Sequence, residues 1–429
     1  MRSNINEFPY FRKLSFGVFL IFIATLAIQK PTFTIAGQNL TASDILFPIV
    51  AILTFSSGVL RKIRVRWFPI YWVFAAYIAA FSLSTVFSAE LSRSVLKTLA
   101  TAYLIGIAVI TISYINSQSR LRVTILTFLV ASSVPILIGL LTIILFYLWN
   151  ESPIIPLLTY HYGAVPVGNY PRLSSIFVSA SMFCNFLNVV LMFLLIAYSK
   201  RWVSKMAFGL GIAAVIVTSI FTISSGLGTL FLAFGLWYWY LNPLRSAGRF
   251  AVWAGTLVFA ITFLLSFFAL QPHSTAPYTI HLPFFATELY PSSRLLVWSE
   301  SVRTFTENFW IGTGPGVASA AVSFQNSEGS YSLLTDAHNS FLSVATQTGI
   351  FGFIALVTLT VYLLRNGFRK VHGEPIKFGV AAAFLTAFVL QGMTGSFEDA
   401  RHLWFLIGLL VAVNEITKTN SAAELGGRT

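Results

Sequence analysis

Charged side chains are scarce in this chain of 429 residues: Asp, Glu, Lys and Arg make up 10% of it, whereas 56% of the residues are hydrophobic. Soluble domains carry about 25% charged residues, because their surfaces must face water. The composition therefore excludes a soluble globular fold. It indicates a polytopic membrane protein that consists mostly of helices.

Cysteine is also nearly absent, since Cys184 is the single one. A lone cysteine cannot form a disulfide within the chain, so redox chemistry does not identify the compartment. The first apolar segment follows Arg2, Arg12 and Lys13, as in a signal peptide, but no A-x-A-type cleavage site comes after it. More apolar segments follow, and we interpret the first one as a retained helix.

Long apolar segments are what the chain does have. A helix needs roughly 20 apolar residues to cross the hydrocarbon core of a bilayer. Such windows predict an all-α fold of about twelve transmembrane helices, forming one integral membrane domain over residues 1–429. The windows are 13–29, 44–60, 68–88, 95–114, 122–149, 173–198, 205–222, 225–241, 250–270, 338–364, 377–396 and 402–417.

Most of the 27 Lys and Arg residues fall in alternate loops and at the two termini. Positive residues stay on the cytoplasmic side, so both termini are expected there and residues 150–172 and 271–337 outside. The net charge of +13 is then an orientation signal and a contact with anionic lipids. No soluble basic patch interleaved with aromatic residues is present, which argues against nucleic-acid binding.

The large outward loop, residues 271–337, contains a predicted amphipathic helix. Its apolar positions recur at spacings of three and four residues: Leu295, Trp298, Val302, Phe305 and Phe309. This pattern is typical of a helix that lies on a membrane surface. Pro291-Ser292-Ser293 offers a helix start with a serine N-cap. Arg294 would lie in the first turn, as an anion-binding or a solvated arginine, and Arg303 is expected to pair with Glu300 and Glu307.

Two groups of glycines follow this helix. Gly312, Gly314 and Gly316 resemble a phosphate-binding loop, but no Lys-Ser/Thr follows and no strand precedes them, so we expect a tight turn instead. Gly349 and Gly352 lie within an apolar window, and each taken singly predicts close packing between helices.

His338 stands where the outward loop passes into an apolar helix. An interfacial histidine is often only a polar residue at a span's edge. Here, however, Thr335 or Asp336 could cap the helix and place His338 in its first turn, where the helix dipole would lower the imidazole pKa. Asp336 and Asn339 could fix its tautomer. The pattern therefore favours an acid–base group at a boundary between water and lipid.

Residues 292–352 resemble the signature region of the bacterial O-antigen ligase and O-antigen polymerase superfamily. The resemblance is carried by Arg294-Leu-Leu-Val-Trp298, by Trp310-Ile-Gly-Thr-Gly-Pro-Gly316 and by His338-Asn339-x9-Gly349-x2-Gly352. It implies a membrane glycosyltransferase of the C-type fold, inverting and independent of metals and cofactors. Such an enzyme transfers a glycan from undecaprenyl diphosphate to an acceptor hydroxyl on the periplasmic face of the bacterial inner membrane.

The resemblance also implies roles for single residues. Arg294 would bind the donor diphosphate and His338 would act on the acceptor hydroxyl. Arg172, in Pro171-Arg172-Leu-Ser-Ser, resembles the family's other loop arginine. Where many members have Ser-Arg-Gly, this chain has Ser224-Ser225-Gly226, so another residue must replace that arginine; Arg401 and Lys97 are candidates.

Several alternatives stay open at this point. A twelve-helix carrier or flippase for a glycolipid would share the layout, although the two halves of the chain show no repeat and the outward loop has no role in a carrier. For an enzyme, the acceptor could be lipid A–core, another repeat unit of a polysaccharide, or a protein. Glu398 and Asp399 are adjacent, but apart from His402 no histidine or cysteine stands at the usual ligand spacing, so a metal site is not expected.

The orientation can be tested with reporter fusions. Fusions placed after the basic segments 61–66, 200–205 and 365–377 should report a cytoplasmic location, and a fusion within 271–337 should report the opposite side. A cytoplasmic 271–337 loop would contradict the proposed chemistry, because the activated donor would then be on the wrong face.

Overall fold

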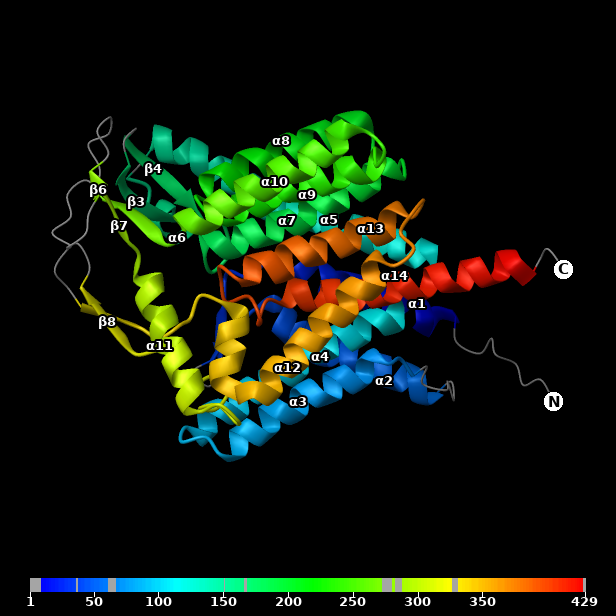
Figure 1. Cartoon of the computed structure of the whole chain (residues 1–429). Helices are drawn as coiled ribbons and strands as arrows, with labels where there is room; N and C mark the ends of the chain where they lie inside the picture. The colour runs from blue at the N-terminus through cyan, green and yellow to red at the C-terminus, as the bar shows by residue number, and fades with distance from the viewer. Residues whose placement is uncertain are drawn as a thin grey trace.

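The computed structural model describes residues 9–35, 38–60, 67–149, 151–165, 168–271, 280–281, 288–325 and 331–426. The fold is mostly helical (Figure 1). Its helices are α1 (Pro9–Thr25), α2 (Ala42–Leu60), α3 (Ile70–Val86), α4 (Leu91–Tyr114), α5 (Gln118–Leu148), α6 (Ile155–Leu158), α7 (Ala180–Ser199), α8 (Lys205–Phe221), α9 (Gly226–Leu241), α10 (Ser246–Leu265), α11 (Ser293–Glu307), α12 (Ser340–Phe368), α13 (Pro375–Ala383), the π-helix η1 (Phe384–Leu390) and α14 (Arg401–Gly426).

Short antiparallel strands form small sheets between the helices. They pair as β1 (Phe33–Ile35) with β2 (Gln38–Leu40), β3 (Thr159–Val165) with β4 (Gly168–Leu173), β5 (Phe268–Gln271) and β6 (Ile280–His281) with β7 (Glu288–Pro291), and β8 (Val322–Gln325) with β9 (Tyr331–Leu334). The two predicted outward loops therefore contain hairpins, and the larger one also contains α11.

Every predicted apolar window coincides with a helix in the described part of the chain. Five helices, α4, α5, α7, α10 and α12, are long and apolar enough to cross a membrane. Others, such as α3, α8 and α9, are apolar but shorter than 18 residues. The helical fold is thus confirmed, whereas the number of twelve spans stays a prediction.

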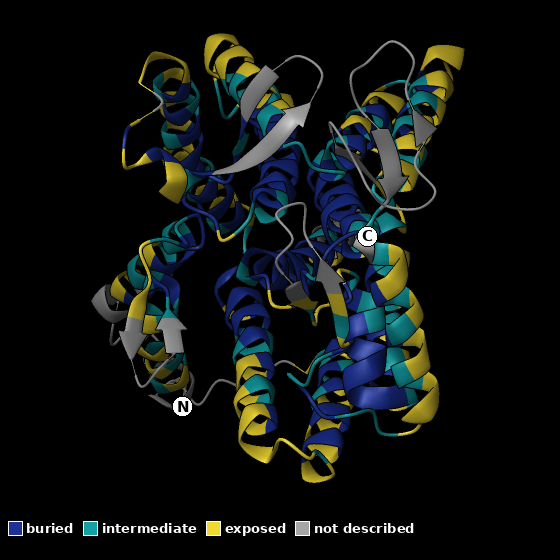
Figure 2. Cartoon of the chain, turned by 90° about the vertical axis from the view of Figure 1, so that its left-hand side faces the viewer, coloured by how far each residue is buried: buried dark blue, intermediate teal, exposed yellow. Residues whose placement is uncertain are grey.

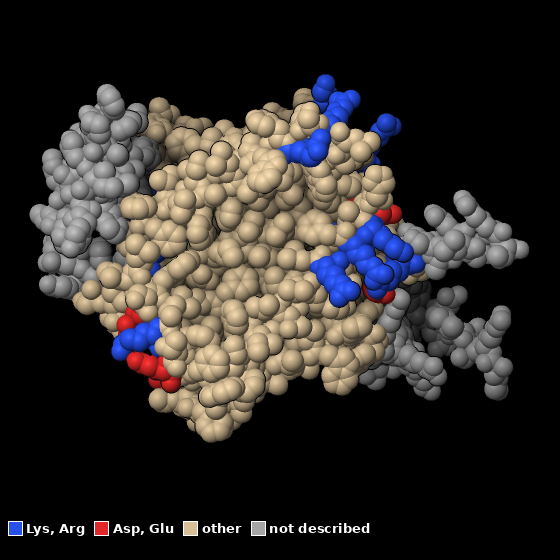
Figure 3. All heavy atoms as spheres, viewed as in Figure 1, with Lys and Arg blue, Asp and Glu red and all other residues tan. Residues whose placement is uncertain are grey.

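The two ends of the helical bundle differ in what they carry. Both chain termini lie at one end, and the hairpins β3–β4 and β6–β7 lie at the other, together with α11 (Figure 1). On the face shown in Figure 3, Lys and Arg gather at the terminal end with a few acidic residues beside them, and a smaller group with charges of both signs lies at the other end near α11. The orientation of the two ends across a membrane stays a prediction of the positive-inside rule. The basic segment 61–66 lies outside the described residues.

Burial is arranged as expected for a protein whose surroundings are apolar. Helix α7 is the most enclosed of the five long helices, and its Phe183, Phe186 and Phe193 are fully buried. Large apolar side chains on the outside of the bundle are exposed, such as Phe55 and Trp253 at 75% and 74%. Seen from the hairpin end, buried residues occupy the inside of the bundle and exposed ones its outside (Figure 2).

Polar side chains bind one another inside this apolar core. Asn188 donates to Thr229 Oγ1 (2.8 Å), which also accepts from Gln391 Nε2 (2.7 Å). Asn185 Nδ2 donates to the carbonyl of Ala387, within η1 (2.7 Å), and its Oδ1 lies 2.7 Å from His402 Nε2. Because lipid offers no hydrogen-bond partners, such bonds fix how α7, α9, η1 and α14 pack together.

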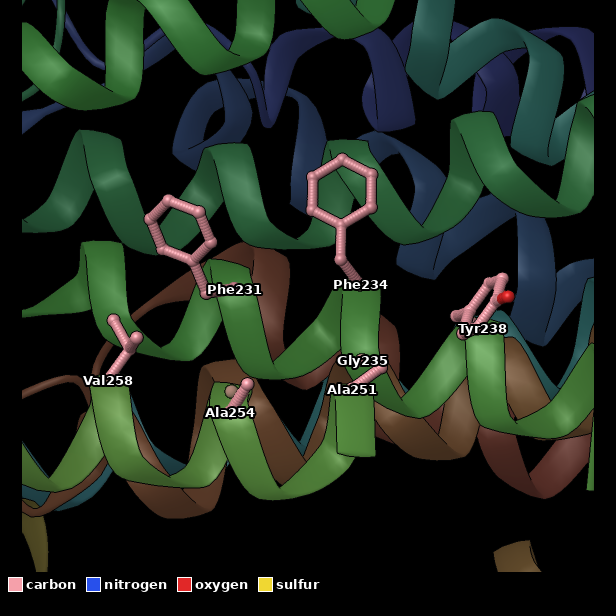
Figure 4. A pocket seen from close by; sticks show the side chains of 8 residues that line it. Phe231, Phe234, Gly235, Tyr238, Ala251, Ala254 and Val258 are labelled. Atoms are coloured by element: carbon pink, nitrogen blue, oxygen red, sulfur yellow. The ribbon is translucent and has the colours of Figure 1, made fainter. Parts of the chain in front are cut away.

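Helices α9 and α10 pack as a close antiparallel pair. A Cβ atom on Gly228 would lie 2.8 Å from the Phe259 Cα, and one on Gly235 would lie 2.5 Å from the Ala251 carbonyl oxygen. The start of α9 therefore lies beside the end of α10. An apolar groove of about 290 Å³ follows the pair, lined by residues such as Phe231, Phe234 and Val258 (Figure 4). Its lining suits a lipid chain better than acid–base chemistry.

Candidate functional site

His338 lies two residues before α12, at the hairpin end of the bundle. Its backbone φ is +48°, a left-handed conformation that is uncommon for residues other than glycine. Its backbone N–H donates to Asp336 Oδ1 (3.0 Å), and its ring Nδ1 lies 3.6 Å from Asp336 Oδ2. The side chain is 47% exposed, so the ring remains accessible. Asp336 therefore lies beside the Nδ1 of the ring, and its role in orienting the imidazole stays a prediction.

The predicted cap of this helix was wrong. Asn339, and not Thr335 or Asp336, is the N-cap of α12: its Oδ1 accepts from the N–H groups of Phe341 (3.0 Å) and Leu342 (3.1 Å). His338 consequently precedes the cap and does not lie in the first turn. Capping occupies the Asn339 Oδ1, so a role of Asn339 beside the imidazole would fall to its Nδ2 and stays a prediction.

The His338 pKa is lowered from its usual 6.5, as expected, but from a different cause. Partial burial of the ring has the largest effect, and the positive charge of Arg294 lowers the pKa further, whereas Asp336 opposes both. Burial and a nearby cation each disfavour the imidazolium. The ring is therefore neutral, and able to accept a proton, near neutral pH.

Arg294 is held near His338 by the way α11 begins. Ser292 caps this helix and its Oγ accepts from the Arg294 N–H (3.3 Å), which confirms the predicted N-cap. The Ser292 N–H donates to the Phe267 carbonyl (2.7 Å), which ties the start of α11 to the end of α10. Arg294 and His338, 44 positions apart in the sequence, are close enough for their charges to interact.

The sequence predicted the ion pairs of the charged face of α11 but not which of its residues are buried. Arg303 pairs with Glu300 (3.0 Å) and Glu307 (3.3 Å), as its spacing indicated. Val297 and Ser301 face the protein and are fully buried, whereas Leu295 and Val302 of the predicted apolar face are 47% and 50% exposed. Trp298 of the same predicted face packs against the ring of Phe267 at the end of α10, with ring centroids 5.1 Å apart. The predicted apolar face is therefore divided between the protein and the outside, and only its exposed part suits contact with lipid.

Arg172 lies on β4, at the hairpin end of the bundle. Its Nε donates to the Thr222 carbonyl (3.3 Å), two residues before Ser224-Ser225-Gly226 and the start of α9. Since the start of α9 lies beside the end of α10, Arg172 and Arg294 are both attached to the same end of this helix pair.

Arg401 and Lys97, the candidates to replace the missing arginine, each have an acidic partner. The Arg401 guanidinium binds Asp44 through two contacts of 2.7 Å. Lys97 donates to Asp399. Of the residues considered for a metal, Asp399 thus pairs with Lys97, Glu398 accepts from Ser343 (3.0 Å), and His402 contacts Asn185. These contacts give the carboxylates and the imidazole roles that need no metal.

Gly349 has a more specific role than close helix packing. Its φ of +63° interrupts α12, and a Cβ atom there would lie 2.4 Å from the Trp310 carbonyl carbon. The break leaves backbone groups without helical partners. The segment 309–314 supplies them: the N–H groups of Thr313 and Gly314 donate to the carbonyls of Thr346 and Gln347 (both 3.0 Å), and the Ile350 N–H donates to the Phe309 carbonyl (2.8 Å).

The glycines of the 309–316 segment allow this close approach. Gly312, Gly314 and Gly316 all have positive φ, which confirms the predicted tight turn. A Cβ atom on Gly312 would lie 2.4 Å from the Gln347 carbonyl carbon. Gly352 makes room for the Thr348 side chain, whose Oγ1 would lie 1.8 Å from an added Cβ atom. Gly349 therefore allows the break in α12 and the close approach of the loop, and Gly352 leaves space for the Thr348 side chain next to the break.

Residues 395–399 were missed by the sequence analysis as part of the site. The Ser396 hydroxyl donates to Asp336 Oδ1, and Ser340 Oγ both donates to the Gly395 carbonyl (3.0 Å) and accepts from the Phe397 N–H (2.8 Å). The segment thus holds the carboxylate beside His338. It stands about 60 positions further along the chain, and its composition gave no signal of this contact.

A sequence model of the O-antigen ligase family matches residues 178–357. The match contains Arg294, His338, Gly349 and Gly352 and the whole predicted signature region, 292–352. Arg172 and the segment 395–399 lie outside it. No curated protein matches the chain.

Gly349→Ala tests the importance of the break in α12. We expect a loss of folded protein or a lower melting temperature, because the substitution adds a clash to a strained φ, and overpacking typically costs about 1–3 kcal/mol. Gly373→Ala is the matched control, since Gly373 also has a positive φ (+78°) but nothing lies within 4 Å of an added Cβ atom. Thermal unfolding in detergent would measure both, and equal melting temperatures would contradict the steric argument.

Proposed function

We propose, from the match of residues 178–357 to the O-antigen ligase family, that this protein is a membrane glycosyltransferase that moves a glycan from undecaprenyl diphosphate to an acceptor hydroxyl. The acceptor is lipid A–core for a ligase, or another repeat unit for a polymerase. The observation that carries the proposal is that Asp336 lies 3.6 Å from the His338 ring, at the hairpin end of an apolar bundle, and that the positive charge of Arg294 acts on the same ring. In our proposal this end faces the periplasm of a bacterial inner membrane and both termini face the cytoplasm.

The proposed reaction is a direct displacement at the anomeric carbon of the donor glycan. The acceptor oxygen forms a bond to that carbon, while the bond from the carbon to the diphosphate oxygen breaks with its electron pair. His338 takes the proton of the acceptor hydroxyl, and undecaprenyl diphosphate leaves. One displacement inverts the anomeric configuration. Donors on this face must already be activated, since ATP and sugar nucleotides are cytoplasmic.

The surroundings of His338 suit this role. A general base must be neutral at the working pH and within hydrogen-bond reach of its substrate. Its pKa is lowered below 6.5, its ring is half exposed, and Asp336 lies on the Nδ1 side. Nε2 is then the atom we expect to accept the acceptor proton, after which Asp336 stabilises the imidazolium.

The arginines suit the departing diphosphate. Negative charge develops on the leaving phosphate, and a guanidinium next to that position lowers the energy of the transition state. Arg294 also lies in the first turn of α11, at the positive end of the helix dipole, which favours an anion. Arg172, at the same end of the α9–α10 pair, would contact the second phosphate.

Arg294→Ala and Arg172→Ala are each expected to lower glycan transfer roughly 10²–10³-fold, because a preorganised positive charge is lost. Lysine at either position should restore activity only in part, since an ammonium cannot form the two-pronged contact of a guanidinium. Arg303→Ala is the matched control, since it is an exposed arginine of the same helix that pairs with Glu300 and Glu307. Transfer by purified protein would measure all of these variants. An essential Arg303 with a dispensable Arg294 would refute the assignment.

His338→Ala is expected to lower transfer roughly 10²–10⁴-fold, the usual effect of removing a positioned base. The variant should insert and fold normally, and donor binding should persist because the arginines are intact. In the unsubstituted protein, activity should rise with pH through a pKa below 6.5, since the base must be deprotonated and its pKa is lowered. Measurements of transfer against pH, with EDTA present, would check both effects. Near-normal transfer by His338→Ala would mean that the base is elsewhere.

A further inference from the structure

Glu398 is a buried carboxylic acid next to the site, and the reaction described above does not use it. It is 8% exposed. Its Oε1 accepts from the Ser343 hydroxyl (3.0 Å), which in turn accepts from Gln347 Nε2 (3.1 Å). Among the described residues, its Oε2 has no hydrogen-bond partner. Burial of a carboxyl oxygen without a hydrogen bond costs free energy of folding. An apolar side chain at position 398 would pack against α12 without that cost.

The hydrogen bonds of Glu398 link it to both halves of the site. Ser343 and Gln347 belong to the part of α12 before the break, and Gln347 Oε1 accepts from the Gly316 N–H of the inserted loop (2.8 Å). Two residues before Glu398, Ser396 holds the Asp336 carboxylate. A movement of Glu398 would therefore displace Asp336, because Ser396 lies two residues away in the same segment. It would also displace α12, because Ser343 of that helix binds Glu398.

The charges around Glu398 come from several elements. Lys97 of α4 and the carboxylates of Asp399 and Asp336 act on it electrostatically, and the buried Tyr77 of α3 lies near it. Burial, together with the two carboxylates, raises the pKa of Glu398 to about 7, against the opposing effect of Lys97. Its charge therefore changes near neutral pH.

We propose that Glu398 is a positioning residue for glycan transfer: through Ser343 and the segment 395–399 it fixes the Asp336 carboxylate and hence the His338 ring. This inference rests on the proposed function. When neutral, Glu398 leaves Asp336 undisturbed; when ionised, it repels Asp336 and weakens its hold on His338. Activity is therefore expected to fall as the pH rises through the ionisation of Glu398, above the pH at which His338 becomes a base.

Three variants separate the parts of this proposal. Glu398→Ala removes the acceptor of the Ser343 hydrogen bond, Ser343→Ala removes its donor, and Glu398→Gln keeps an acceptor oxygen but cannot ionise. The Ala variants are expected to lower kcat roughly 10- to 10²-fold, the effect of a misplaced catalytic group, and to leave KM for the donor within about twofold. Glu398→Gln should retain kcat at pH 6.5 and lose the decline at higher pH.

Further variants serve as controls. Asp399→Asn should move the decline to lower pH, because it removes a carboxylate that raises the Glu398 pKa and leaves Lys97 to lower it. Glu307→Gln, an exposed acid of α11, should keep the unsubstituted profile. Because Glu398→Ala could fail to fold, Ser343→Ala and Glu398→Gln test the same link, and their folding would be checked by gel filtration and thermal unfolding.

The outcomes distinguish the two proposals. If the unsubstituted protein transfers no glycan from any lipid-diphosphate donor, the proposed function fails. If it transfers glycan and His338→Ala does not, but Glu398→Gln keeps the same decline with pH, the positioning role is wrong. An unchanged kcat in both Ser343→Ala and Glu398→Ala would overturn it as well.

Discussion

The break of α12 at Gly349 is the constraint on which the site depends. Backbone groups freed by a broken helix cannot find water inside a bilayer, so they must be bound by another part of the protein. The segment 309–314 does this with three backbone hydrogen bonds. Gly312 and Gly349 have no side chains, so the backbones of the loop and of α12 can lie in contact. Because the partners are backbone atoms at fixed positions, the loop and the helix can meet in only one register.

This register determines where the charged residues lie. Helix α11 is attached at both ends. At its start, the Ser292 N–H donates to the Phe267 carbonyl at the end of α10, and just after its end the segment 309–314 binds the backbone of α12 at the break. Arg294 is at the first of these points, and His338 precedes the part of α12 that the loop binds. An arginine and a histidine far apart in sequence are thereby brought close enough for the guanidinium to lower the imidazole pKa. The same arrangement places the proposed base and the proposed anion-binding group at one end of the bundle, as the proposed transfer from a diphosphate requires.

The surroundings of the site are polar in a protein that is otherwise apolar. Asp336, Ser396, Glu398, Lys97 and Asp399 form a connected group in which one carboxylate is half exposed and another is almost fully buried. Low dielectric surroundings strengthen such interactions and make each partner sensitive to its neighbours' charge. Activity in this protein is therefore expected to depend on residues well outside the matched family region, such as those at 395–399.

Local signals in the sequence were sufficient for several features. Apolar windows predicted the helices, Ser292 was identified as a cap, and the spacing of Glu300, Arg303 and Glu307 predicted their pairing, because these features involve residues within a few positions of each other. The cap of α12 was misassigned, since Thr335, Asp336 and Asn339 are all good capping residues and only the chain's path selects one. The meaning of Gly349, the exposure of the apolar face of α11 and the contact of Ser396 with Asp336 were decided by the tertiary structure. They depend on hydrogen bonds and close packing between segments tens of residues apart, which no local pattern records.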